Sequence, residues 1–216
     1  MPAAPGSIQR SFGALTQAGR VLTGRQIAGR GLTVFPDDIF LVSYPRSGNT
    51  WVRFLLGNLI YQDDPVTFSN VESRIPEIYF NRDRLLRQLP RPRMLKSHEC
   101  FQPHYPRVIY IVRDPRDVAI SFYHHNVKAR NIPDDYPMAS FVPRFIAGEF
   151  DRKFGSWRDN VLRTALRGDD PDFVMLRYEE MKSDTATRFA RSWPSSSTAV
   201  FARSIPALRR CNGRLN

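Results

Sequence analysis

Two short polar segments of this 216-residue chain could together bind a phosphorylated ligand. One runs from Arg46 through Ser47, Gly48 and Asn49 to Thr50 and follows an apolar run, so that backbone N–H groups, a hydroxyl and a positive charge gather where a helix begins. In the other, Arg113 directly follows a second apolar run, and Ser121 comes two helical turns later. A guanidinium and a hydroxyl can share one phosphate group. We therefore expect two anion-binding pockets that face one crevice.

Lys96 and His98 are candidates for catalysis at the end of a third apolar segment. A neutral histidine titrates near physiological pH and can take the proton of an acceptor hydroxyl or amine. Lys96 and Arg46 can stabilise negative charge on a leaving phosphate oxygen. Because most isolated histidines are structural or exposed, His98 is favoured over His104 and His124 by its place after a strand end and a lysine.

Neither a metal site nor a nucleoside triphosphatase is expected. Cys100 and Cys211 are the two cysteines, and neither has a partner at metal-ligand spacing. Cys100 lies two residues from His98, but a small half-buried side chain is the simpler interpretation. The pattern GxxxxGK[ST] is absent, which argues against the alternative of a kinase-like phosphotransferase that uses ATP and magnesium.

The charge of the chain favours anionic partners without indicating nucleic acid. The net charge is +11, and six arginines without any acidic residue lie in 185–216. Removing these six positive charges leaves about +5 for the rest. A basic protein that binds nucleic acid stays open as an alternative, although nothing resembles a module that reads DNA or RNA.

Strands alternate with helical segments along the middle of the chain. Apolar runs predict strands at 39–43 and 107–112, and further strands are predicted at 93–96 and 172–177. Spacing and end signals predict helices at 49–61, 82–89, 115–128, 138–148 and 156–167. This order predicts an α/β fold with a parallel sheet flanked by helices, whose ligands bind beyond the carboxyl ends of the strands.

Three segments resemble PAPS-dependent sulfotransferases, where PAPS is 3′-phosphoadenosine 5′-phosphosulfate. Residues 44–51 read YPRSGNTW and resemble the 5′-phosphosulfate loop YPKSGTTW. Residues 112–121 resemble the 3′-phosphate segment RNPKDVAVSYYH, and residues 95–98 resemble the K-[ST]-H segment of the active site. Arg46 replaces the lysine of the family and Asn49 its first threonine; arginine keeps the charge but donates as a rigid fork.

Two weaker matches keep the same order along the chain. Residues 154–157 resemble the YGSW stretch of the family, and residues 176–182 resemble its YEDMK segment. In the second segment, the resemblance gives Tyr178 a contact on the adenine side of the nucleotide, and it places Trp51 near the adenine. Arg116 and Asp117 are expected to be surface charges that form a local ion pair.

The resemblance implies a cytosolic-type sulfotransferase domain with a fold like that of P-loop nucleoside triphosphate hydrolases. Such an enzyme moves a sulfuryl group from PAPS to a hydroxyl or amine of a small-molecule acceptor, without a metal or a covalent intermediate. The catalytic residues are then His98, Lys96 and Arg46. The residues that bind PAPS are Arg46, Ser47, Gly48, Asn49, Thr50, Trp51, Arg113, Ser121 and Tyr178.

We expect three parts in the chain. Residues 1–36 would be a flexible basic leader, 37–184 a partial sulfotransferase domain, and 185–216 a divergent or disordered tail rich in arginine and serine. The C-terminal RKGxxGxW segment of the family is not found, so an inactive, truncated relative that binds nucleotide weakly or not at all stays open as an alternative.

The remaining expectations concern surroundings and partners. No apolar run reaches the roughly 20 residues of a membrane-spanning helix, and two cysteines without a disulfide framework favour the reducing cytoplasm. A homodimer is left open. The acceptor pocket is expected to be formed by residues 62–92 and 126–150.

Overall fold

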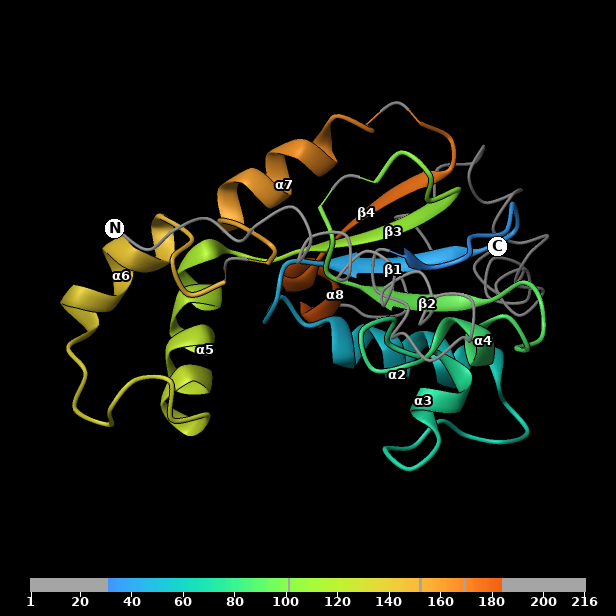
Figure 1. Ribbon diagram of the computed structural model, residues 1–216, viewed down its shortest axis with the longest axis horizontal. Coiled ribbons are helices and arrows are strands. Elements are labelled where there is room, and N and C mark those ends of the chain that lie inside the picture. The colour runs from blue at the N-terminus through green and yellow to red at the C-terminus, as the bar shows by residue number, and fades with distance from the viewer. Residues whose placement is uncertain (1–30, 101, 152, 169, 184–216) are drawn as a thin grey trace, which may run out of the picture.

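The computed structural model describes residues 31–183 except for residues 101, 152 and 169 (Figure 1). Its strands are β1 (Ile39–Ser43), β2 (Met94–Ser97), β3 (Arg107–Val112) and β4 (Phe173–Arg177). Its helices are α2 (Asn49–Ile60), α3 (Val71–Arg74), α4 (Asp83–Leu86), α5 (Pro115–Lys128), α6 (Met138–Ile146), α7 (Trp157–Ala165) and α8 (Tyr178–Ser183). The expected tail, and the expected leader up to residue 30, lie outside the described residues.

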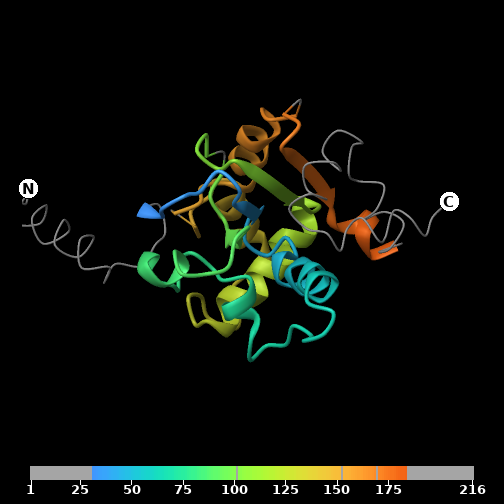
Figure 2. The same ribbon diagram turned by 90° about the vertical axis from the view of Figure 1, so that its right-hand side faces the viewer.

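The four strands form one parallel sheet in the order β2-β1-β3-β4. All residues of β1 and β2 are buried. This explains the nearly continuous apolar run of β1, whereas in β2 the apolar Met94 and Leu95 are followed by the buried polar residues Lys96 and Ser97. Helices α2 and α3 lie on one side of the sheet and α7 on the other in both views (Figures 1 and 2). Helices α5 and α6 extend beyond the end of the sheet at which β3 terminates (Figure 1). The prediction of an α/β fold with a parallel sheet is confirmed.

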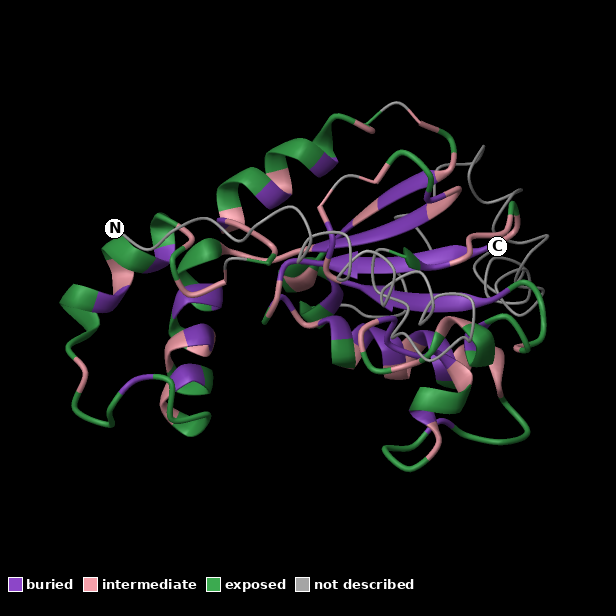
Figure 3. Cartoon of the chain, in the orientation of Figure 1, coloured by how far each residue is buried: buried purple, intermediate pink, exposed green. Residues whose placement is uncertain are grey.

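Each face of the sheet carries its own apolar core. Side chains alternate along a strand, so Ile39 and Leu41 pack with α2, whereas Phe40 and Val42 pack in the core on the other face. Burial of a side chain of this size contributes about 1.5–3 kcal/mol. Figure 3 shows the buried residues concentrated in the strands and on the inner faces of the helices. This two-sided core fixes the strand ends from which the site is built.

Packing starts before residue 37, where the domain was expected to begin. Leu32 is buried in the core on the Phe40 face. The backbone N–H of Thr33 donates to Asp83 Oδ1 at 2.7 Å, and the fully buried Arg93 donates to the Thr33 carbonyl at 2.8 Å. Arg93 also forms a buried ion pair with Asp38. Residues 32–35 are therefore part of the domain and not of a flexible leader.

The helices differ from the sequence-based expectation at their ends and in number. Helices α4, α6 and α7 are each shorter than predicted, and α3 and α8 were not predicted. Helix α3 has only four residues, too few for a periodic pattern to show. Helix α8 follows β4 without a loop, so no turn residues mark its start.

Candidate functional site

The loop after β1 leaves backbone N–H groups at the start of α2 available to a ligand. Arg46 and Gly48 both have left-handed backbone conformations, with φ of 69° and 93°. Gly48 is the N-cap of α2; no side chain caps this helix, and its first turn contains no acidic residue. The first N–H groups of a helix have no partner within it, and the helix dipole adds partial positive charge there. This geometry suits an anion such as a phosphate group.

The side chains of this loop point in different directions. The Ser47 hydroxyl is buried and has no hydrogen-bond partner among the described residues. The buried Asn49 amide donates to the Leu41 carbonyl at 3.3 Å and to Ser43 Oγ at 3.2 Å. The Asn49 amide N–H groups thus tie the loop to β1, while Asn49 Oδ1 is buried without a partner among the described residues. Thr50 is exposed in the first turn of α2.

The two predicted anion pockets meet. Arg46 Nε donates to Ser121 Oγ at 3.2 Å, and Arg113 Nη1 donates to the Arg46 carbonyl at 3.4 Å. The pairing of β1 with β3, in register from Ile39 with Arg107, places the loops after both strands side by side. The Arg113 Nε donor is buried without a partner among the described residues. Buried polar atoms of this kind are rare in proteins, so Arg113 Nε and Ser47 Oγ suit a ligand that would complete their hydrogen bonds.

Tyr178 joins the two pockets from the start of α8. Its ring lies 5.4 Å from the Trp51 ring, edge to face, and the Arg113 guanidinium lies 4.5 Å above it. A Cβ atom added to Gly48 would be 2.3 Å from Tyr178 Cδ2. Only glycine therefore fits below this ring. The structure brings Trp51 and Tyr178 together beside the loop that follows β1; their contact with an adenine stays a prediction.

His98 is held in the tautomer that a general base requires. Its Nδ1 lies 2.8 Å from the Ser43 carbonyl, which can only accept, so Nδ1 carries the proton and Nε2 has the free lone pair. Burial, and then the positive charge of Lys96, lowers the pKa of His98 to about 3. His98 is therefore neutral across the physiological pH range.

Lys96 is part of a buried ion pair that the sequence did not predict. Its ammonium group contacts Glu77, and both side chains are about 10% exposed. Glu77 lies 19 residues earlier, in the segment between α3 and α4, and a backbone bridge also joins it to Lys96. Lys96 would reach a ligand oxygen only by sharing or leaving Glu77. No sequence motif marks Glu77 as a partner of this site.

A comparison with known proteins identifies the family. The family model for the sulfotransferase domain matches residues 36–191. The chain belongs to this family. Among curated relatives, the chain is 34% identical to Sulfotransferase 1A1 of Bos taurus over 166 residues, which cover 69% of the chain and 55% of the relative. It is 33% identical to Sulfotransferase 2B1 of Homo sapiens over 162 residues, covering 68% and 43%. The chain thus spans about half the length of the curated relatives it matches.

Solved structures share the sulfotransferase fold. Mouse sulfotransferase SULT7A1, complexed with PAP, matches with a TM-score of 0.60 and 26% identity, covering 86% of this chain and 67% of that one. Retinol dehydratase in a complex with retinol and PAP matches with a TM-score of 0.63 at 19% identity, over 91% of this chain and 69% of that one, which shows the fold alone.

The charges at the start of α5 pair differently from the prediction. Arg116 pairs with Asp114 at 2.6 Å, and Asp117 pairs with Arg113 at 3.2 Å. The expected ion pair between Arg116 and Asp117 is therefore wrong. Asp114 is the N-cap of α5 and accepts from the Arg116 backbone N–H at 2.8 Å, which also draws the Arg116 side chain toward Asp114. Asp117, one turn after Arg113, is left to pair with that guanidinium.

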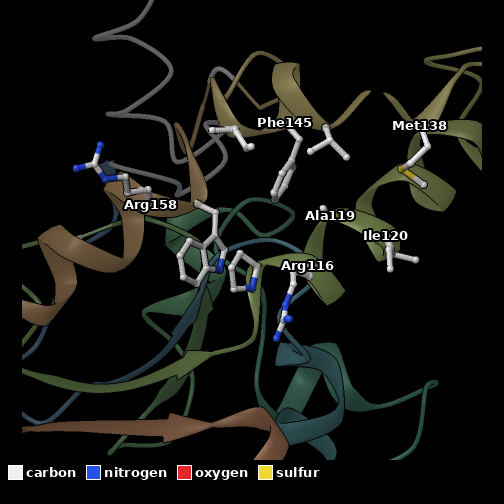
Figure 4. Close-up of a pocket in the computed structure, with 10 residues that line it drawn as sticks. Arg116, Ala119, Ile120, Met138, Phe145 and Arg158 are labelled. Carbon is white, nitrogen blue, oxygen red and sulfur yellow. The ribbon is translucent and has the colours of Figure 1, made fainter. Parts of the chain in front are cut away.

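An apolar cavity of about 520 Å³ lies between α5, α6 and α7 of the sulfotransferase domain (Figure 4). On α5 it is lined by Pro115, Arg116, Ala119 and Ile120. At 100° per residue, these positions lie on the opposite face of α5 from Ser121. The guanidinium groups of Arg116 and Arg158 point away from its centre in Figure 4. This cavity is thus separate from the crevice that Ser121 faces.

Two further features concern metals and membranes. Within residues 31–183 as described, no group of three or more His, Cys, Asp and Glu side chains could hold a metal ion. In the same part of the chain, no helix has the length and apolar character needed to cross a bilayer.

Proposed function

We propose that this protein transfers a sulfuryl group from PAPS to a hydroxyl or amine of a small-molecule acceptor. The observation that carries the proposal is the contact between the two anion pockets, through Arg46 and Ser121 at 3.2 Å and Arg113 and the Arg46 carbonyl at 3.4 Å. A nucleotide with phosphate groups on both the 3′ and the 5′ oxygen of its ribose can reach both pockets at once. Membership of the sulfotransferase domain family supports the same conclusion.

The residues present fit such a donor. Ser47 Oγ and Arg113 Nε are buried polar atoms without a described partner, one in each pocket. The uncapped start of α2 offers backbone N–H groups to the 5′ end, and Arg113 with Ser121 offers a fork and a hydroxyl to the 3′ phosphate. Trp51 and Tyr178 offer aromatic surface to the adenine ring of the nucleotide.

Different side chains of the site would take the acceptor proton and stabilise the leaving group. Bound PAPS would supply the sulfuryl group together with a phosphate leaving group. His98 Nε2 takes the proton of the acceptor, while the Ser43 carbonyl holds Nδ1–H and stabilises the resulting imidazolium. Arg46 offers positive charge to the leaving oxygen. A base with a pKa of about 3 is weak, but negative charge on a ligand beside His98 raises that pKa and makes the base stronger.

The test is sulfuryl transfer from radiolabelled PAPS to a panel of phenols and amines. We expect turnover by the wild-type chain and a loss of about 100-fold or more in His98→Ala, the low end of the effect of losing a general base. His104→Ala is the matched control because His104 is exposed and contacts Tyr105 instead; its activity stays within about twofold, since a surface residue takes no part in proton transfer.

Two results would contradict the proposal in different ways. Nucleotide binding without any turnover would leave an inactive relative of the sulfotransferases as the correct description. Full turnover by His98→Ala would show that the base lies elsewhere.

The proposal extends to surroundings and partners. We propose a cytoplasmic enzyme that acts on small molecules and does not bind nucleic acid, because the excess positive charge is concentrated in residues 185–216. A homodimer is the oligomeric form we would test for first, by light scattering with and without nucleotide.

A further inference from the structure

A second cavity, of about 420 Å³, lies beside the phosphate loop. It is lined by Arg46, His124, His125, Lys128 and Ala129. Residues 124, 125 and 128 follow Ser121 by three, four and seven positions, so they lie on the same face of α5. The face of α5 that presents Ser121 to Arg46 therefore continues directly into this cavity. The apolar cavity of Figure 4 lies on the opposite face.

The cavity carries positive charge that nothing described balances. No acidic residue lines it. In the part of the chain that the structure describes, no carboxylate forms an ion pair with Arg46 or Lys128. Arg46, His125 and Lys128 line one space. Burial, and then the positive charges of Arg46 and Lys128, lower the pKa of His125. The His125 ring is held by stacking on Phe122, with ring centroids 6.3 Å apart.

The donor nucleotide does not account for this cavity. The two phosphate-binding pockets of the donor are formed by the start of α2, Arg113 and Ser121, all of them at or before the middle of α5. The α5 residues that line the cavity begin with His124, about one turn after Ser121, and Arg46 also lines it. Because Arg46 lines this cavity and also contacts Ser121, a molecule in the cavity would lie next to the guanidinium that we propose to face the leaving oxygen.

We propose that this cavity binds an anionic group of the acceptor, so that the preferred substrates are hydroxylated aromatic carboxylates. The inference rests on the proposed function, because it treats the space beside Arg46 as the acceptor side. Lys128 offers a flexible ammonium group, and the two imidazole rings offer N–H donors to a carboxylate. The apolar parts of these rings and Ala129 leave room for an aromatic scaffold, and a volume of about 420 Å³ suits a small bicyclic molecule.

A pair of fluorescent acceptors that differ by one carboxylate tests the inference. We would titrate 6-hydroxy-2-naphthoate and 2-naphthol into the protein at constant ionic strength, with and without adenosine 3′,5′-bisphosphate. We expect the naphthoate to bind about tenfold more tightly, which corresponds to about 1.4 kcal/mol. Lys128→Ala and His125→Phe should each bring this ratio toward one. Arg163→Ala, which removes an exposed helical cation from α7 instead, is the matched control and keeps the ratio.

Each outcome is decisive for the inference. Equal binding of the two naphthols, binding of neither, or an unchanged ratio in Lys128→Ala and His125→Phe would overturn it. The proposed function is judged separately, by whether adenosine 3′,5′-bisphosphate raises the melting temperature. Absence of that shift would contradict the sulfotransferase proposal, while the preference for the carboxylate would still be measured in the titration without nucleotide.

Discussion

The two loops that follow β1 and β3 start from neighbouring buried strands, yet they differ in how the next helix begins. At α2, the N-cap is Gly48, no side chain caps the helix, and the first turn has no acidic residue. At α5, the N-cap is Asp114, which accepts from the Arg116 backbone N–H at 2.8 Å, and Pro115 occupies the first turn, where no N–H is needed. The start of α5 thus has a side-chain cap, whereas the first N–H groups of α2 have none and are the ones that we propose to bind the ligand.

In the proposed site, two neighbouring strand–loop–helix units would therefore bind one ligand by different means. The β1–α2 unit offers backbone N–H groups and the buried Ser47 hydroxyl, whereas the β3–α5 unit offers the Arg113 and Ser121 side chains. Capping decides which kind of contact a helix start can make. Substitutions in the two loops should therefore affect binding and stability in opposite proportions.

The largest effect on nucleotide binding is expected for Gly48→Ala, which disrupts the backbone conformation of the loop after β1. The substitution forces a left-handed residue to carry a Cβ atom and places that atom 2.3 Å from the Tyr178 ring. We expect calorimetry to show binding of adenosine 3′,5′-bisphosphate weakened by roughly 100-fold, or about 2.7 kcal/mol. Gly155→Ala is the control: its φ is 75°, but nothing lies within 4 Å of the added atom. Nearly normal binding by Gly48→Ala would contradict the close contact of loop and nucleotide.

Ser47→Ala should change nucleotide binding and the stability of the free protein in opposite directions. Because the Ser47 hydroxyl is buried without a described partner, its removal should stabilise the free protein by about 1 kcal/mol while weakening nucleotide binding by about tenfold. Thermal unfolding and calorimetry would measure the two effects. The control is Ser156→Ala, since Ser156 caps α7 and its hydroxyl is satisfied by Asp159. That variant should lose stability and keep binding; a loss of stability in Ser47→Ala would refute the assignment.

The smallest effect on binding is expected for Asp114→Ala at the start of α5. Loss of the cap should lower the melting temperature by a few degrees, and loss of a negative charge beside Arg113 should leave nucleotide binding unchanged or slightly tighter. Hydrogen bonds from the Arg116 side chain and backbone lower the pKa of Asp114 to about 2. The stabilisation by Asp114 is therefore complete above about pH 4 and is lost as the pH falls through 2.

The pH dependence of the melting temperature is the control for the Asp114→Ala prediction. The difference in melting temperature between the wild type and Asp114→Ala should stay constant from about pH 5 to pH 8 and shrink only in strong acid. A large loss of nucleotide binding in Asp114→Ala would mean that the cap, and not only the side chains of Arg113 and Ser121, holds the ligand.

The sequence predicted those parts of the fold that local patterns encode. Strand β1 is buried along its whole length, so it is a continuous run that ends at a turn. Asp114 and Pro115 mark the start of α5 because a cap and a first-turn proline are local signals. The predicted site residues of both loops lie together because β1 and β3 are parallel neighbours, and parallel strands bring their carboxyl ends to one edge of the sheet.

The parts that were not predicted depend on contacts between residues distant in sequence. Ile75 and Ile78 are fully buried in a segment for which no strand or helix was predicted, and nothing local distinguishes them from exposed loop residues. Glu77 pairs with Lys96 across 19 residues, and the tautomer of His98 is set by the Ser43 carbonyl, 55 residues away. The close contact of Tyr178 with Gly48 likewise exists only after β4 has joined the sheet.

The central claim, that two anion pockets serve one nucleotide, is tested most directly by comparing adenosine 3′,5′-bisphosphate with adenosine 5′-monophosphate. These ligands differ only in the 3′ phosphate that Arg113 and Ser121 would hold. Calorimetry should show the bisphosphate binding about 10- to 100-fold more tightly to the wild type, as expected for a charge-assisted contact, and Arg113→Gln should abolish that preference while keeping its affinity for the monophosphate. Equal affinities in the wild type, or an unchanged preference in Arg113→Gln, would contradict the account.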